Sequence, residues 1–176
     1  MPESGGLRLF FALWPDDEVR ARIVRETAAA VADSGGCVIA PDNLHVTLLF
    51  LGHTPHSHVD QITAAAARVR CRRFRLTLDQ IETWARSHLV ALTSAAPPDE
   101  ARELAGSLRA QLAGLVPDEE REFRPHVTLA REARRRSGAR SIEPIEWAAR
   151  DFALVESNMT RTGSQYAVRE RWPFTG

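Results

Sequence analysis

The stretch Leu44-His45-Val46-Thr47-Leu48-Leu49-Phe50-Leu51, closed by Gly52, is the part of the sequence that says most about the fold. A short apolar run that ends at a turn residue is typical of a buried strand. Its tetrad His45-Val46-Thr47-Leu48 recurs unchanged as His126-Val127-Thr128-Leu129, within a second predicted strand over Arg124–Ala130. An identical repeat that includes histidine is improbable by chance, so the two strands are expected to be related.

Strand geometry predicts how each tetrad is used. Side chains two residues apart lie on the same face of a strand. His45 and Thr47 therefore share one face, while Val46 and Leu48 lie on the other face and can anchor the strand in a core. The second tetrad has the same alternation. If the two strands are related by a pseudo-twofold axis, two imidazoles and two hydroxyls converge at one place.

The remaining segments predict an α+β fold with largely antiparallel sheets, because strands adjoin in pairs and helices are few. A helix is expected from Pro15 to about Asp33, since proline and acidic residues open it and Gly35-Gly36 ends it. The other predicted helices are His56–Arg70 and Pro97–Leu115. The other predicted strands are Leu7–Trp14, Cys37–Ala40, Phe74–Glu82, His88–Thr93, Phe152–Ser157 and Gln165–Trp172.

The chain length of 176 residues fits one domain, or two small lobes around a shared cleft. Its 23 basic and 23 acidic residues cancel, and every basic residue is arginine. Without lysine, the chain has no side chain for a Schiff base, a lysyl-nucleotide intermediate or a Walker A loop. The zero net charge argues against a uniformly basic nucleic-acid surface, although it leaves room for a local basic groove.

Other residues carry weaker signals. Cys37 and Cys71 match no zinc or redox spacing, so free thiols in a reducing compartment are expected. The sequence has neither a signal-peptide pattern nor an apolar run long enough to span a membrane, so the expected location is the cytoplasm. Solvated faces are the favoured interpretation of the basic stretch Arg68–Arg75 and of the acidic loop with Asp118, Glu119, Glu120 and Glu122.

The paired histidines and threonines suit the chemistry of a phosphodiester. An unperturbed histidine pKa of about 6.5 allows one ring to be neutral and the other protonated near neutral pH. The neutral ring can remove a proton from water, while the charged ring donates one to the leaving oxygen. Threonine hydroxyls can bind the nonbridging phosphate oxygens, so no metal or cofactor is expected. For His53, His56 and His58, a solvated loop is favoured over a metal site, because carboxylate and cysteine partners are missing nearby.

The sequences around the two tetrads make this signal specific. Together they resemble the 2H phosphoesterase superfamily, and most closely the bacterial and archaeal RNA 2′,3′-cyclic phosphodiesterases, formerly described as 2′-5′ RNA ligases. The resemblance spans most of the chain. The segments that carry it are Arg8–Leu13, Asn43–Gly52, Arg124–Arg131, Tyr166 and Trp172-Pro173-Phe174.

The resemblance implies a fold, a reaction and a partner. The implied fold is a single bilobal α+β domain over residues 1–176, with pseudo-twofold lobes, two antiparallel sheets and flanking helices around a central cleft. The implied reaction opens a terminal 2′,3′-cyclic phosphate on RNA and leaves the phosphate on the 2′ oxygen. Reverse 2′-5′ ligation of tRNA halves is a second implied activity. We expect a cytoplasmic monomer whose partners are RNA ends, including tRNA fragments, and not a membrane.

The same resemblance implies a role for each site residue. His45 would donate a proton to the departing 3′ oxygen, and His126 would activate water. Thr47 and Thr128 would hold the phosphate, and Arg131 would add a charged contact. This arginine opens a second basic cluster, which either attracts an RNA backbone at the cleft mouth or forms a solvated loop. The cluster contains Arg131, Arg134, Arg135, Arg136 and Arg140.

Two departures from the family leave the preferred substrate open. Aromatic residues common in the family are replaced by Cys37-Val38-Ile39 before the first tetrad and by Ala91 in the strand His88–Thr93. Substitute stacking residues are Phe10, Phe11 and Trp84, although aromatic side chains in strands more often pack in a core. The alternative functions are a non-catalytic nucleotide- or RNA-binding module and a phosphodiesterase for a small cyclic nucleotide phosphate.

Overall fold

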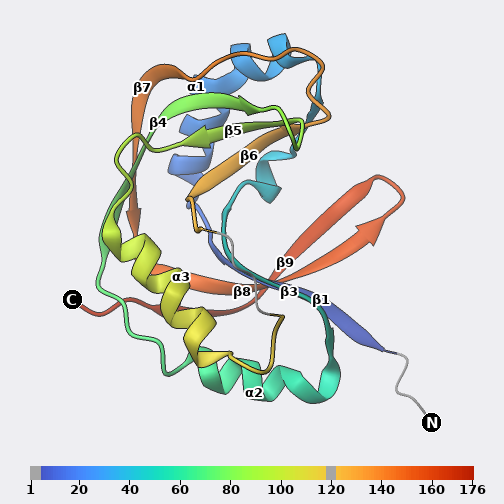
Figure 1. Cartoon of the computed structure of the whole chain (residues 1–176), viewed down its shortest axis with the longest axis vertical. Coiled ribbons are helices and arrows are strands. Elements are labelled where there is room, and N and C mark those ends of the chain that lie inside the picture. The colour runs from blue at the N-terminus through green and yellow to red at the C-terminus, as the bar shows by residue number, and fades with distance from the viewer. Residues whose placement is uncertain (1–4, 118–121) are drawn as a thin grey trace.

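The computed structural model describes residues 5–117 and 122–176, which form an α+β fold (Figure 1). The helices are α1 (Asp17–Ser34), α2 (His56–Ala66) and α3 (Asp99–Gln111), with a short 3-10 turn η1 (Pro41–Asn43). The strands are β1 (Gly6–Leu13), β2 (Cys37–Val38), β3 (Val46–Pro55), β4 (Phe74–Trp84), β5 (Leu89–Thr93), β6 (His126–Arg131), β7 (Arg140–Ala149), β8 (Asp151–Thr160) and β9 (Gly163–Pro173). Among the described residues, none of the helices has the length and hydrophobicity that a membrane-spanning helix needs.

The sheet consists of two four-stranded halves that meet at a single residue pair. The first half-sheet contains β3, β1, β8 and β9, and the second contains β7, β4, β5 and β6, with β2 paired to β6. The two halves are joined where Val46 of β3 pairs with Val127 of β6 in antiparallel orientation. All named strands pair antiparallel. The predicted α+β class is therefore confirmed, and the two antiparallel sheets are continuous through one pair.

The four strands of the second half-sheet follow one another in the chain, whereas the first half-sheet combines β1 and β3 with β8 and β9 from the far end of the chain. β1 pairs with β3 on one side and with β8, from the far end of the chain, on the other. Although α1 directly follows β1, it packs against β6 and β7 of the second half-sheet. Conversely, α3 follows β5 yet packs mainly against β3 and α2 (Figure 1). Helices that follow strands of one half-sheet therefore pack against the other half-sheet.

Local sequence explains the boundaries of α1. The Asp16 carboxylate accepts a hydrogen bond from the backbone N–H of Val19 at 2.9 Å, which caps the first turn. Gly35 ends the helix in the left-handed conformation, with φ of 64°. One face is buried against the second half-sheet, and it carries Val19, Ile23, Thr27 and Val31.

Two features differ from the sequence prediction. The helix α2 ends at Ala66 rather than Arg70, because the next backbone hydrogen bonds tighten, with Arg68 and Val69 donating to carbonyls three residues back. Strand β7 was not predicted, because Pro144 interrupts its sequence. Strand β7 lies at the edge of the sheet and pairs only with β4, so Pro144 can lie in it without losing a hydrogen bond to a second neighbouring strand.

Residues 118–120 of the predicted acidic loop lie outside the described residues.

Gly36 lies where β2 approaches β6, and it offers a test of this packing. A Cβ added there would lie 2.5 Å from the Arg131 carbonyl oxygen and 3.2 Å from the Ala133 backbone. Backbone atoms cannot rotate away, so Gly36→Ala should lower the free energy of unfolding by about 1–3 kcal/mol in urea denaturation. The matched control is Gly106→Ala in α3, where an added Cβ meets nothing within 4 Å. It should raise stability by up to about 1 kcal/mol, and equal losses in both variants would contradict the packing argument.

Candidate active site

The pairing of Val46 with Val127 brings the two tetrads side by side in opposite directions. Continuing the antiparallel register by one residue on each side places His45 opposite Thr128 and Thr47 opposite His126. Both valines are fully buried, so the two histidines and two threonines share the opposite face, where all four are half-buried. The structure thus brings together the four tetrad side chains singled out in the sequence.

Each imidazole is held by the backbone carbonyl two residues before it. Nδ1 of His45 lies 2.7 Å from the carbonyl oxygen of Asn43, and Nδ1 of His126 lies 2.8 Å from that of Arg124. A carbonyl oxygen only accepts, so Nδ1 carries the proton and donates it in both rings. Nε2 is therefore the atom that each neutral ring offers to a substrate. In the first tetrad the Thr47 hydroxyl, 2.9 Å away, donates to it.

Three aromatic side chains enclose His45. Its ring centre lies 4.9 Å from Phe10, 5.4 Å from Trp14 in a nearly parallel stack, and 5.3 Å from Tyr166 in an edge-to-face contact. Burial among these rings lowers the pKa of His45 to about 4. The Asn43 carbonyl opposes this shift, while the positive charges of His126 and Arg131 add to it. His45 is therefore neutral at pH 7 in the free protein.

His126 has one aromatic neighbour and a charged pair beside it. Its ring centre lies 4.5 Å from that of Trp84, whose ring also has the Arg124 guanidinium over it at 5.4 Å. Arg124 donates to the Glu82 carboxylate, and the Thr93 hydroxyl donates to the same carboxylate at 2.9 Å. Burial lowers the pKa of His126, the Arg124 carbonyl raises it, the Arg124 charge lowers it, and Glu82 raises it. The two histidines thus occupy unlike environments in spite of identical tetrads.

A β-bulge in β6 brings Arg131 to the same face. Ala91 pairs with Thr128 but Val90 pairs with Ala130, so Leu129 is an extra residue in β6. Leu129 and Ala130 are both buried, and the alternation resumes with Arg131 exposed. Without the bulge, Arg131 would face the core. Its effect on the pKa of His45 agrees with this orientation, because the guanidinium charge acts across the shared face.

The predicted basic cluster around Arg131 is divided between two cavities. Arg131, Arg134 and Arg136 line a cavity of about 750 Å³ together with Ser87 and His88, near the end of β6. A different cavity is lined by Arg135 and Arg140. Neither imidazole is among the residues that line these two cavities, whereas Arg131, on the tetrad face, lines the first of them.

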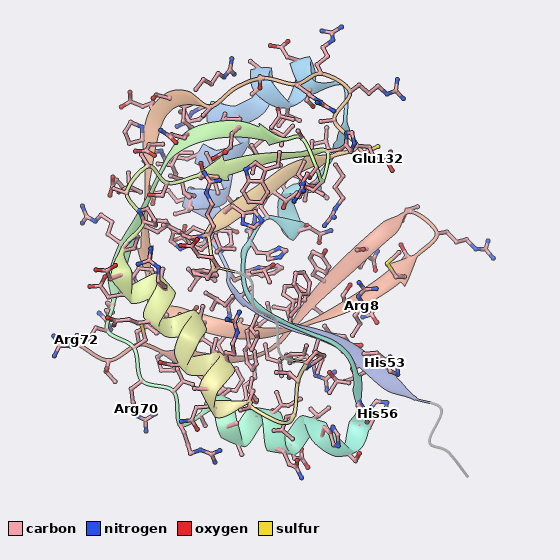
Figure 2. All side chains as sticks on the ribbon, in the orientation of Figure 1. Arg8, His53, His56, Arg70, Arg72 and Glu132 are labelled. Carbon is pink, nitrogen blue, oxygen red and sulfur yellow. The ribbon has the colours of Figure 1, made fainter. Side chains whose placement is uncertain are left out.

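The other charged stretches lie elsewhere on the molecule. Figure 2 shows Arg70 and Arg72 on the opposite side of the molecule from Glu132, which follows Arg131. Their cavity is also lined by acidic residues, namely Asp99, Glu100 and Glu103. His53 pairs with Arg8 at the edge of the first half-sheet (Figure 2). Within the described ranges, no three His, Cys, Asp or Glu side chains are grouped to hold a metal ion.

Sequence reasoning did not place Trp14, Tyr166 and Glu82 beside the tetrads. These contacts depend on strand pairings between distant segments, which no local pattern encodes. The candidate stacking residues Phe10 and Phe11 are buried, with 2% and 0% of their surface exposed, so they do not offer a free ring face. Trp84 is half-buried and contacts both His126 and Arg124.

Comparison with known proteins agrees with this geometry. Residues 14–162 match the family model of the 2′-5′ RNA ligase superfamily. The RNA 2′,3′-cyclic phosphodiesterase of Escherichia coli (strain K12) is 37% identical over 174 residues, covering 96% of this chain and 97% of that protein. The protein of the same name from Thermus thermophilus is 30% identical, covering 97% of this chain and 91% of the relative.

Solved structures show the same relationship over the whole chain. E. coli LigT complexed with 3′-AMP is similar with a TM-score of 0.91 and 33% identity, covering 98% of this chain and 100% of that chain. The T. thermophilus protein TT0787 is similar with a TM-score of 0.82 and 28% identity, covering 96% of this chain and 98% of that chain. Sequence and fold therefore agree, and this chain belongs to the 2′-5′ RNA ligase superfamily.

Proposed function

We propose that this chain is an enzyme that opens terminal 2′,3′-cyclic phosphates on RNA and leaves a 2′-phosphate. The observation that carries the proposal is the pair of tetrads, in which two carbonyl-fixed imidazoles each offer Nε2 on one shared face. Relatives named RNA 2′,3′-cyclic phosphodiesterase, similar over nearly the full length, support it. We take residues 1–176 as one domain whose lobes are related by a pseudo-twofold axis through the Val46–Val127 pair.

In the proposed mechanism, water attacks phosphorus while Nε2 of His126 removes its proton. The bond between phosphorus and the 3′ oxygen breaks, and Nε2 of His45 gives that oxygen a proton. Thr47 and Thr128 bind the nonbridging oxygens, and Arg131 adds a positive charge. His45 is neutral in the free protein, so it takes up its proton when the negative phosphodiester binds and raises its pKa. Protonated Nε2 then no longer accepts from Thr47, which frees that hydroxyl for the phosphate.

The same site supports reverse ligation as part of the proposal. A ribose 5′-hydroxyl in place of water attacks the cyclic phosphorus, the 3′ oxygen leaves with a proton, and a 2′-5′ phosphodiester forms. The chain has no lysine, so this joining cannot proceed through a lysyl-nucleotide intermediate. We infer that tRNA halves are one such substrate, that the enzyme acts as a monomer, and that it works in the cytoplasm. The free thiols Cys37 and Cys71 support a reducing compartment.

Removing either imidazole tests the assignment. His45→Ala and His126→Ala should each lower kcat for a cyclic-phosphate oligonucleotide by at least about 100-fold, because each removes one proton-transfer group. Product formation is measured with a chelator present, which should leave the wild-type rate unchanged. His58→Ala is the matched control and should retain wild-type activity. Full activity in either tetrad variant would refute the roles proposed for the two histidines.

The same assay separates the alternative functions. Tight nucleotide binding by the wild-type protein, with no product after long incubation, would replace the proposal with a binding module. A much higher kcat/KM for cyclic mononucleotides than for oligonucleotides would instead indicate a small cyclic phosphate as substrate.

Anion binding should depend on pH. An anion at the tetrads raises the pKa of His45 from about 4, so binding takes up a proton and affinity increases as pH falls from 8 to 5. Sulfate is the probe, because it does not itself titrate in this range. Calorimetry in two buffers of different ionisation enthalpy measures the proton uptake. His45→Gln should reduce the pH dependence and His58→Gln should not; an equal slope in all three proteins would contradict the shift.

The arginine-lined cavity should matter only for longer RNA. Replacing Arg134 and Arg136 with serine should raise KM for a ten-nucleotide substrate and reduce the slope of log KM against log salt by up to about 1.4. Cyclic mononucleotides should be unaffected, because Arg134 and Arg136 lie beyond Arg131, the last residue of β6 and the only arginine proposed to contact the phosphate. The matched control replaces Arg70 and Arg72, on the opposite side of the molecule. An equal effect in that control would mean that the arginines act only through overall charge.

A further inference from the structure

The backbone carbonyl that holds each imidazole belongs to a residue whose own side chain is anchored elsewhere. Before the first tetrad this residue is Asn43, whose side-chain amide donates to the backbone carbonyl of Ser164 in β9 at 2.7 Å. Before the second it is Arg124, whose guanidinium donates to the Glu82 carboxylate in β4. In both copies, the residue two positions before the histidine therefore links the imidazole to a strand outside the tetrads.

The anchor of the second copy carries charge and is largely removed from water. The Glu82 side chain is only 15% exposed, whereas that of Arg124 is 52% exposed. The hydroxyl of the fully buried Thr93 donates to the same oxygen of Glu82 at 2.9 Å. Thr93 lies in β5, directly opposite His126. The strand beside β6 therefore fixes the carboxylate, and the carboxylate in turn fixes Arg124 through a charge-assisted hydrogen bond.

Trp84 connects this ion pair to the imidazole. It lies two residues after Glu82 in β4, so the two side chains share a face of that strand. The centre of its ring lies 5.4 Å from the guanidinium carbon of Arg124 and 4.5 Å from the centre of the His126 ring. Arg124 is thus held by the carboxylate and by the indole face. Fixing this side chain restrains its backbone carbonyl, which accepts from Nδ1 of His126.

The charge of Glu82 also acts on His126. The charged and titratable groups that face this ring are Glu82 of β4, Arg124 before β6 and His45 before β3, while β5 contributes the uncharged Thr93. Burial lowers the pKa of His126, and the Arg124 charge lowers it as well, whereas the Glu82 charge raises it. A general base is most effective when its pKa lies near the operating pH, so the carboxylate opposes a loss of basicity.

We propose that Glu82 is a positioning residue for His126. Its carboxylate holds Arg124 so that the main-chain carbonyl of that residue keeps the proton on Nδ1 and leaves Nε2 free for the attacking water. It also offsets the positive charge that Arg124 brings close to the base. The proposal rests on the proposed function, in which His126 removes a proton from water. Glu82 acts through Arg124 and not by touching the reacting atoms.

An NMR titration of the histidine rings tests this role without requiring turnover. Glu82→Gln keeps the shape and an acceptor oxygen but removes the charge, so the pKa of His126 should be about 0.5–1 lower than in the wild type. The matched control is Glu146→Gln in β7. Glu146 also accepts from a threonine, Thr77 at 3.0 Å, and pairs with Arg75, so its replacement should leave the pKa of His126 unchanged.

Kinetics with a cyclic-phosphate oligonucleotide provide a second readout. Glu82→Leu removes the acceptor for Arg124 and should lower kcat about 10-fold with KM changed less than about twofold, because it disturbs the base and not substrate contacts. Glu82→Gln should retain about a third of the wild-type kcat, since its amide oxygen still accepts from Arg124.

Two results would overturn the role of Glu82. One is an unchanged pKa of His126 in Glu82→Gln, and the other is an equal change in Glu146→Gln. Both variants keep the size of the side chain, so this comparison does not depend on how well Glu82→Leu folds. Absence of turnover by the wild type would instead refute the proposed function, while the titration would still decide whether Glu82 acts on His126.

Discussion

The antiparallel pairing of Val46 with Val127 is the constraint on which the site depends. It joins one half-sheet built from the two ends of the chain to another built from the middle, and it sets each histidine opposite the threonine of the other tetrad. A slip of one residue would turn His45 and Thr47 toward the core and expose Val46 and Leu48. The apolar members of the tetrads, all buried, oppose such a slip, so the core determines where the polar members meet.

The two tetrads have identical sequences, but their histidines have different neighbours. The repeated backbone gives both rings the same tautomer, because each Nδ1–H donates to the carbonyl two residues before it. The neighbours are not repeated: Phe10, Trp14 and Tyr166 surround one ring, while Trp84 and the Arg124–Glu82 pair flank the other. Symmetric geometry with asymmetric surroundings is a physical basis for dividing acid and base work between two identical side chains.

The sequence predicted the parts of the fold that depend on local periodicity. The alternation within each tetrad, the limits of α1 and the antiparallel class all follow from nearest-neighbour patterns. Strand β7 was not predicted because its proline is tolerated only in an edge strand, and the position of a strand in the sheet depends on the whole fold. Trp14, Tyr166 and Glu82 reach the tetrads through pairings between distant segments. The sequence made no prediction for the side chain of Phe50, because nothing local marks Leu48 as the extra residue of β3 that turns Phe50 outward.

That extra residue changes the length of the recurring unit. In a regular strand, the sixth residue counted from the histidine lies on the opposite face, so a four-residue description of the motif ends before it. With one residue absorbed by the bulge, the sixth position returns to the histidine's face and is occupied by Phe50 in one copy and Arg131 in the other. The unit to compare between related chains is therefore His-x-Thr-x-x followed by a variable sixth residue. Its first and third positions are shared by the two copies, whereas its sixth is where each copy acquires a chemistry of its own.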